Sequence, residues 1–244
     1  MRIVTNVCQN PKVPILQIIC IPFAGSGASF FRNLRPPQLD VSLVPVQLPG
    51  REERFADLMP TSVGSAADDI AESLSQAIDP SVPSVIFGHS LGAVLAFETV
   101  RRMPESISHL FVSGSPDPWH PRTERAGELS DAEFLDRVED FAQYRHPALE
   151  DPEMRDIILP ALRADVTMHE SYIAMPGDVI GVPITAMRGV DDRLVSEAEM
   201  LGWRRATSDS FNLTSLSGSH MYLVDKPLHV LEVVVKEACR RRAQ

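Results

Sequence analysis

The chain has 244 residues, 44% of them hydrophobic and 23% charged, a composition typical of a soluble globular protein long enough for one sizeable domain. Its formal net charge of −10 argues against non-specific nucleic-acid binding, because such binding needs a basic surface. No apolar run approaches the ~18 residues that span a bilayer, and the first residues lack the apolar core of a secretion signal. The three cysteines, Cys8, Cys20 and Cys239, lie far apart and have no metal-ligand spacing. We therefore expect a cytoplasmic protein with reduced thiols that uses neither a metal nor a cofactor.

Short apolar runs alternate with amphipathic helical patterns along most of the chain. The first two runs, Ile15–Ile21 and Val41–Val46, have the length and composition of strands buried on both faces. Apolar residues at helical spacing then extend from Val63 to Ile78. Further strands are expected at Val82–Phe87, Ile107–Val112, Val182–Met187 and Phe211–Leu216, and further helices at Leu91–Met103 and Pro227–Arg241. This alternation predicts a single α/β domain, residues 1–244, with a mostly parallel sheet covered by helices.

The interval from about Pro116 to Gly177 breaks the alternation. It contains no convincing strand but has helical patterns over Leu129–Phe141 and Pro152–Asp165, with a weaker one over Val166–Ala174. An insertion of this length between two sheet strands is either a small packing subdomain or a lid over a site. We expect residues 116–177 to form a helical lid, because long inserted segments are often functional.

The stretch Gly88-His89-Ser90-Leu91-Gly92 lies between a predicted strand and a predicted helix, which is the context of a nucleophile elbow. A sharp strand-to-helix turn leaves no room for Cβ atoms beside the serine, so both flanking positions favour glycine. The turn lifts the Ser90 hydroxyl clear of the sheet, at the positive end of the following helix. The alternative is a chance match to Gly-x-Ser-x-Gly, which the flanking strand and helix make less frequent. Ser90 is therefore the candidate nucleophile of a serine hydrolase.

A serine hydroxyl needs a base to take its proton, and the elbow fold orders the partners as serine, acid, histidine. Of the seven histidines, His220 follows the last predicted strand, whereas His229 falls inside the last helix and His89 is expected to be a packing residue. We expect His220 to be the base. Asp191 and Asp192 follow the preceding strand, and either could orient the imidazole while the other serves as a turn or capping residue. Spacing alone does not distinguish them.

An oxyanion hole needs two backbone donors. One is the N–H of the residue after the nucleophile, Leu91, and the other comes from the loop after an early strand. That loop, Pro22-Phe23-Ala24-Gly25-Ser26-Gly27-Ala28, is rich in small residues that let the backbone approach a substrate. A phosphate-binding loop is the alternative interpretation of its glycines, but the chain has neither Gly-Lys-Ser/Thr nor Gly-x-Gly-x-x-Gly.

With these residues in place, the chain resembles the stand-alone type II thioesterases that serve nonribosomal peptide and polyketide synthases. The likeness covers almost the whole chain, through Ile21-Pro22-Phe23-Ala24-Gly25, residues 48–54, residues 88–98, residues 129–135, residues 159–165, Gly189-Val190-Asp191-Asp192 and Gly218-Ser219-His220-Met221-Tyr222. The resemblance implies an α/β-hydrolase fold in which the inserted helices are the lid. It also implies that the triad acid is Asp192, the last residue of a Gly-x-x-Asp pattern, and that the oxyanion donors are the N–H groups of Ala24 and Leu91.

The resemblance further implies a substrate and a partner. Such enzymes hydrolyse acyl groups from the phosphopantetheine arm of acyl or peptidyl carrier proteins, for editing or release during biosynthesis. We expect the chain to act on a carrier protein as a monomer, without nucleic-acid or membrane partners. The chemistry agrees, since a thiol with a pKa near ~8.5 leaves far more readily than an amine. The residues alone leave two alternatives: a carboxylesterase or lipase acting on oxygen esters, and a non-catalytic hydrolase-fold binding protein.

Overall fold

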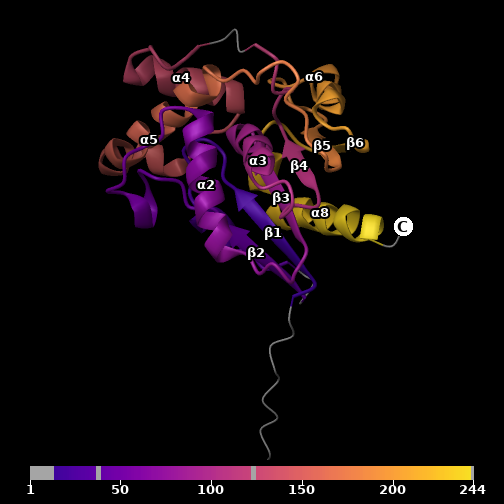
Figure 1. The fold of residues 1–244 in the computed structure, drawn as a ribbon. Coiled ribbons are helices and arrows are strands. Elements are labelled where there is room, and N and C mark those ends of the chain that lie inside the picture. The colour runs from indigo at the N-terminus through magenta and orange to yellow at the C-terminus, as the bar shows by residue number, and fades with distance from the viewer. Residues whose placement is uncertain (1–13, 37–39, 122–124, 243–244) are drawn as a thin grey trace, which may run out of the picture.

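The computed structural model describes residues 14–36, 40–121 and 125–242, which form a six-stranded sheet with helices on both faces (Figure 1). The strands are β1 (Leu16–Ile21), β2 (Val41–Pro45), β3 (Ser84–His89), β4 (Leu110–Ser113), β5 (Ile184–Gly189) and β6 (Phe211–Leu216). Their order across the sheet is β2-β1-β3-β4-β5-β6, and each neighbouring pair is parallel. The loops that follow the strands therefore all leave from one edge of the sheet, which is where a site can be assembled.

Each predicted strand is confirmed within two or three residues at either end, and β6 has the predicted bounds. The helices are α1 (Ser29–Arg32), α2 (Val63–Ala77), α3 (Leu91–Arg102), α4 (Asp131–Ala142), α5 (Pro152–Glu170), α6 (Glu197–Leu201), α7 (Tyr222–Asp225) and α8 (Pro227–Arg242). Three 3-10 turns, η1 (Glu52–Arg54), η2 (Pro147–Glu150) and η3 (Gly202–Ala206), complete the described elements. The sequence analysis did not predict the short helices α1, α6 and α7, because four or five residues are too few to show a period. No helix in the described ranges is long and apolar enough to cross a membrane.

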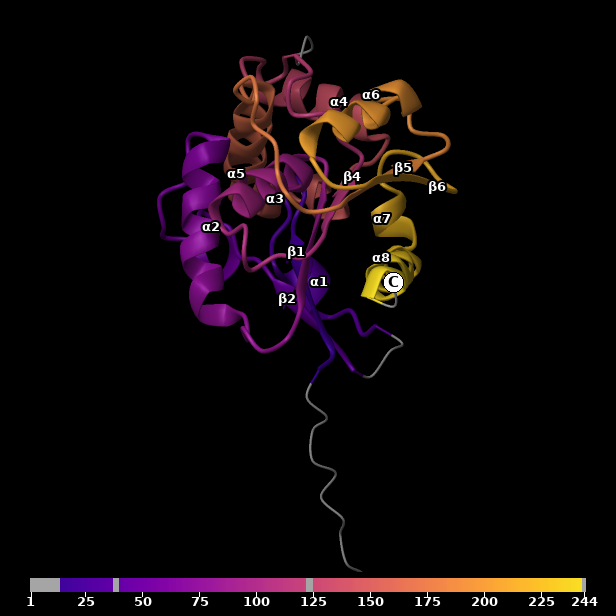
Figure 2. The ribbon, with the colours of Figure 1, turned by 45° about the vertical axis from the view of Figure 1, so that its right-hand side comes forward.

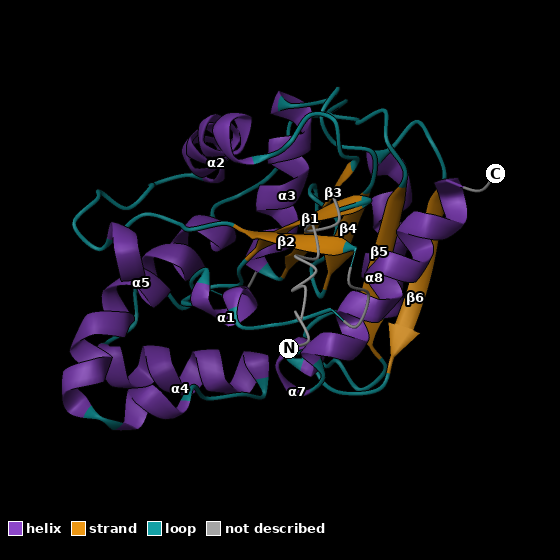
Figure 3. Cartoon of the chain, turned by 90° about the horizontal axis from the view of Figure 1, so that it is seen from below, coloured by secondary structure: helices purple, strands orange, loops and turns teal. Residues whose placement is uncertain are grey.

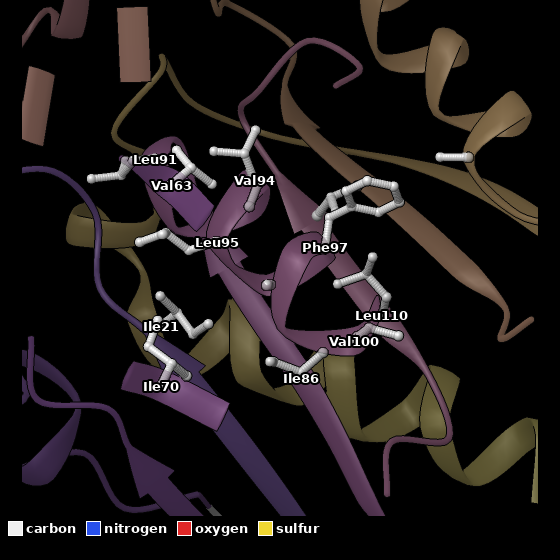
Figure 4. Close-up of a cluster of buried hydrophobic side chains, with 14 of the residues drawn as sticks. Ile21, Val63, Ile70, Ile86, Leu91, Val94, Leu95, Phe97, Val100 and Leu110 are labelled. Carbon is white, nitrogen blue, oxygen red and sulfur yellow. The ribbon is translucent and has the colours of Figure 1, made fainter. Parts of the chain in front are cut away.

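Helices α2 and α3 pack on one face of the sheet, and α1, α7 and α8 pack on the other (Figures 2 and 3). Residues 91–100 of α3 are all buried, because this helix lies beneath α2 and contacts α5 as well as the sheet. Figure 4 shows part of the resulting core, in which Phe97 of α3 lies beside Leu110 of β4, and which also contains Val94 of α3 and Ile86 of β3. A helix that is buried on all sides has a fixed position in such a core. The start of α3 is therefore rigidly placed.

The insertion between β4 and β5 contains α4, η2 and α5 (Figure 1). It has a hydrophobic cluster of its own. That cluster joins Phe134 and Leu135 of α4 to Leu149 of η2 and to Leu159 and Leu162 of α5. The weaker helical pattern over residues 166–174 is not a separate helix. Residues 166–170 instead continue α5, which ends at Glu170. Across residues 116–121 and 125–177, the described part of the expected interval, there are two packed helices and one 3-10 turn, and they lie at the carboxyl edge of the sheet.

Candidate active site

The predicted site residues follow strands β1, β3, β5 and β6, at the edge of the sheet where those strands end. Strands β1 and β3 are neighbours, but the helix after β1 packs on one face of the sheet and the helix after β3 on the other. At such a switch point the two loops diverge and leave a crevice between them, which is where open α/β sheets bind ligands. The predicted oxyanion loop follows β1, and the predicted nucleophile follows β3.

Ser90 occupies the sharp turn between β3 and α3, with a φ of 54° and a ψ of −118°. Few non-glycine residues adopt a positive φ, so this turn is strained in the way that a nucleophile elbow is. A Cβ atom on Gly88 would overlap the carbonyl oxygen of Gly92, and one on Gly92 would lie 2.7 Å from the carbonyl oxygen of Ile21. The two glycines therefore let α3 approach both its own strand and the end of β1.

The structure brings the predicted base and one of the two predicted acids together. Nδ1 of His220, after β6, lies 3.0 Å from Oδ2 of Asp192, after β5. Both residues are buried, with exposed fractions of 2% and 7%. Asp191 is exposed, and its carboxylate has no part in this pair. The two loops approach closely because Gly189 has no side chain; a Cβ atom there would overlap the carbonyl oxygen of Gly218.

The surroundings of Asp192 favour its ionised form. Burial raises the pKa of this carboxyl, but hydrogen bonds from His220 and from the backbone outweigh that effect, so the pKa lies below its ordinary value. The backbone donors are the N–H groups of Leu194 and Val195, at 2.9 Å and 3.0 Å from Oδ1. A buried, fully bonded carboxylate of this kind can hold an imidazole in one orientation and stabilise its cation.

A buried polar layer lies behind His220. Nδ1 of His89 is 2.8 Å from Oγ of Ser113, which in turn is 2.5 Å from the hydroxyl oxygen of Tyr222. The rings of His89 and His220 lie 5.1 Å apart, and Gly114, with a φ of 55°, leaves space for both. Burial and the neighbouring His220 hold the pKa of His89 well below its ordinary value. His89 is therefore a neutral packing residue, in agreement with the sequence-based expectation.

The predicted oxyanion donors lie on the two neighbouring loops of the switch point. Residues 23–26 form a tight turn in which the N–H of Ser26 donates to the carbonyl oxygen of Phe23 at 3.0 Å, and Gly25 has a φ of 74°. Among the described residues, neither the N–H of Ala24 nor that of Leu91 donates a hydrogen bond to another protein group. Amides without an internal acceptor are what an oxyanion hole requires.

A cavity of about 830 Å³ is lined by Ser90, His220 and Ala24 at its base. Much of its wall is apolar and comes from the inserted segment, through Phe141, Leu149, Met154, Ile157, Ile158 and Leu162. In the described part of the chain no hydrogen bond joins the half-buried Ser90 side chain to His220, although both face this cavity. Catalytic hydrogen bonds are often long in unliganded sites and tighten when substrate binds. The cavity is large enough for a ligand of drug size.

No metal site appears within residues 14–36, 40–121 and 125–242, where no three His, Cys, Asp or Glu side chains form a group that could hold an ion. Cys20 and Cys239 are free thiols, and Cys8 lies outside the described residues. The sequence analysis gave no role to Arg51 and Asp165, which form a buried ion pair beside the oxyanion loop. The motifs of the resemblance contain both residues, but no pattern links two positions so far apart along the chain.

The strand order, the strained serine turn and the Asp192–His220 pair define an α/β-hydrolase fold of the serine hydrolase class. A family model described as a thioesterase domain matches residues 16–237. The gramicidin S biosynthesis protein GrsT of Aneurinibacillus migulanus is 32% identical over 230 residues, which are 91% of this chain and 88% of that protein.

Solved structures agree with these matches. The type II thioesterase BorB of the borrelidin biosynthetic cluster superposes with a TM-score of 0.80 at 31% identity, covering 93% of each chain. The thioesterase RedJ of the prodiginine pathway in Streptomyces coelicolor gives 0.81 at 31% identity, covering 91% of each chain. The chain belongs to the thioesterase family, among the type II thioesterases of nonribosomal peptide and polyketide pathways. The predicted fold, family and enzyme class are confirmed.

Proposed function

We propose that this thioesterase works through an acyl-enzyme in which Ser90 is the nucleophile, His220 the general base and Asp192 the acid that orients it. The N–H groups of Ala24 and Leu91 are the oxyanion donors. The proposal is carried chiefly by one observation: the strained Ser90 turn and the buried Asp192–His220 pair converge on the same apolar cavity. The two unbonded amides lie on the loops that meet at this point.

The reaction follows from these positions. Oγ of Ser90 attacks the thioester carbonyl carbon while Nε2 of His220 takes the hydroxyl proton, and the carbonyl oxygen becomes an oxyanion held by the two amides. The tetrahedral intermediate then breaks its carbon–sulfur bond, and His220 gives the proton to the departing thiol. A water molecule attacks the acyl-serine in the same manner, with His220 again as base, and releases a carboxylic acid and free Ser90. Asp192 stays ionised throughout and stabilises the imidazolium.

The substrate of this reaction is an acyl group on the phosphopantetheine arm of an acyl or peptidyl carrier protein, and the hydrolysis serves editing or release in peptide or polyketide biosynthesis. An apolar cavity under residues 116–177 suits the acyl chain, so these residues act as the lid of a single 1–244 domain. The enzyme acts as a monomer. A cytoplasmic location agrees with the free thiols of Cys20 and Cys239.

Two measurements test the proposal. A fluorophosphonate probe should label wild-type protein on Ser90 alone, and Ser90→Ala should abolish the labelling. Hydrolysis of an acyl-pantetheine thioester should then exceed hydrolysis of the matched oxygen ester in kcat/KM, and an acylated carrier protein should be a better substrate than the free acyl-pantetheine. Labelling at another residue would refute the assignment of Ser90, and equal rates for the free and carrier-bound thioesters would refute the carrier as partner.

A further inference from the structure

Helix α5 of the inserted segment is tied to the oxyanion loop by a buried ion pair. Oδ2 of Asp165, on α5, accepts hydrogen bonds from Nη1 of Arg51 at 2.5 Å and from the N–H of Gly25 at 2.8 Å. Its other oxygen, Oδ1, accepts from Nη2 of Arg51 at 2.8 Å. The two side chains are only 7% and 2% exposed. A bidentate pair so well removed from water is among the strongest and most directional polar contacts that a protein makes.

Arg51 makes two further hydrogen bonds to backbone carbonyls. Its Nη1 also donates to the carbonyl oxygen of Ser26 at 3.2 Å, and its Nε donates to that of Pro49 at 3.4 Å. Asp165 thus holds the oxyanion loop through the N–H of Gly25, and Arg51 holds it through the carbonyl of Ser26. Side chains from outside the loop therefore bond to it on either side of the peptide unit that joins Gly25 to Ser26.

The amides of Ala24 and Gly25 in this turn differ in their hydrogen bonding. The N–H groups of the two central residues, Ala24 and Gly25, have no acceptor within the 23–26 turn. Only that of Gly25 is bonded, to Asp165. Asp165 accepts the N–H of Gly25, whereas the N–H of Ala24 has no acceptor among the described residues, and Ala24 lines the cavity. Packing supports the same geometry, since a Cβ atom on Gly25 would lie 2.8 Å from Cδ1 of Leu162, one turn before Asp165 on α5. Ala24 itself packs against both the core of the sheet and the cluster of the insertion.

We propose that Asp165 and Arg51 are positioning residues that aim the Ala24 amide at the oxyanion, so that catalysis depends on α5 being seated on the oxyanion loop. The inference rests on the proposed function, because it takes Ala24 as an oxyanion donor. Neither residue touches the reacting atoms. When α5 moves away from Gly25, the Gly25 amide loses its acceptor and the turn is free to reorient. The geometry of the oxyanion hole thereby depends on the position of the lid helix α5.

The test compares Asp165→Asn with wild type, using an acyl-pantetheine thioester and two inhibitors. One inhibitor is the trifluoromethyl ketone analogue, whose adduct with Ser90 carries an oxyanion; the other is an unreactive thioether of the same length. We expect kcat to fall by about 10²-fold, the typical effect of losing one oxyanion donor, with KM changed by less than about threefold. The trifluoromethyl ketone should lose affinity by the same factor as kcat/KM, while the thioether binds as before. Unchanged kcat, or equal losses for both inhibitors, would overturn the proposal.

Two controls separate positioning from stability. Removing one member of a buried ion pair destabilises a protein, whereas replacing both by apolar residues is often neutral. The double variant Arg51→Met with Asp165→Leu should therefore regain thermal stability but keep the low kcat; full recovery of kcat would refute the proposal. Glu98→Gln removes a carboxylate, 5% exposed, that pairs with Arg101 and Arg102 at the far end of α3. This variant should lower the Tm without changing the affinity for the trifluoromethyl ketone.

Ser90→Ala measured alongside keeps the two proposals distinguishable. An inactive Ser90→Ala together with a fully active Asp165→Asn would refute the positioning role alone. An active Ser90→Ala would refute the proposed function itself.

Discussion

The nucleophile elbow and the inserted helices stand on opposite sides of one cavity, and they are built in different ways. The elbow is set by backbone: Gly88 and Gly92 admit no side chain, and the following ten residues of α3 are buried. The insertion is set by side chains: α4 and α5 share a small cluster of their own, and Met154 and Ile157 on α5 are 40% and 50% exposed. The end of α5 joins the main core through Met168, and the buried pair of Asp165 with Arg51 ties the helix to the oxyanion loop.

The difference indicates how tasks are divided in this enzyme. The proposed catalytic groups follow strands of the sheet, where dense packing keeps them fixed before substrate arrives. The wall proposed to meet the acyl chain belongs to a segment in which some apolar residues, such as Met154 and Ile157, are exposed, so these residues can be altered with little harm to the core. Changes in the elbow should therefore reduce turnover for every substrate. Changes in the insertion should instead alter the order of kcat/KM among substrates with different acyl groups.

The largest effect is expected for Ser90→Ala. Removing the nucleophile removes the covalent route, so kcat should fall by at least roughly 10³-fold for short and long acyl groups alike. The Tm should change little, because Ser90 is only half-buried and its Oγ makes no hydrogen bond to another described residue. His220→Ala should fall by a comparable factor, and combining the two changes should add little. Residual turnover that depends strongly on acyl length would contradict the division between elbow and insertion.

The next effect separates the two adjacent acids. Asp192→Asn should lower kcat by about 10²-fold, less than Ser90→Ala, because the acid orients and stabilises the imidazole rather than attacking. Asp191→Asn is the matched control and should stay within about twofold of wild type, since Asp191 is exposed and outside the His220 pair. Steady-state kinetics on one thioester are sufficient. If the two variants lose activity equally, the role of Asp192 is refuted.

A smaller and selective effect is expected for Ile157→Ser on α5. Ile157 lines the cavity, so a polar replacement should lower kcat/KM for a long acyl chain by about three- to tenfold, the range of one weakened apolar contact. Acetyl-pantetheine and the fluorophosphonate probe should react as before. The control is Ile173→Ser, which changes an equally exposed isoleucine outside the cavity lining. A uniform loss for all chain lengths would show that the insertion supports turnover itself.

The last expected effect is on stability and its dependence on pH, and not on catalysis. Because the pKa of His89 is held well below its ordinary value, this side chain stays unprotonated in the native state at a pH where the unfolded chain takes up a proton, near pH ~6.5. The unfolded state then binds more protons, so the free energy of unfolding falls as pH drops below that value, by up to about 1.4 kcal/mol per pH unit. The free energy of unfolding, measured with urea at several pH values between 7 and 5, should fall less steeply with decreasing pH for His89→Gln than for wild type. His229→Gln, on an exposed face of α8, should keep the wild-type slope; identical slopes for all three would exclude His89 as the cause.

The sequence predicted the platform well, because buried parallel strands and the glycine-flanked serine are local signals that survive tertiary packing. The choice of Asp192 over Asp191 came from the family pattern and not from spacing. The remaining parts depend on contacts that no local pattern contains. Gly114 matters only because the rings of His89 and His220 lie beside it, and the short helix α7, which carries Tyr222, is too brief to show a period.

The ion pair between Arg51 and Asp165 also marks a seam for engineering. Exchanging the inserted segment between related enzymes is a natural way to transfer acyl preference, and the segment that would be exchanged carries Asp165 and Leu162 while the recipient keeps Arg51 and Gly25. A donor segment without a carboxylate at the position of Asp165 would leave a buried guanidinium unpaired. Successful chimeras should therefore be chosen by whether both halves of this pair match at the junction, before any resemblance in the acyl-binding wall is considered.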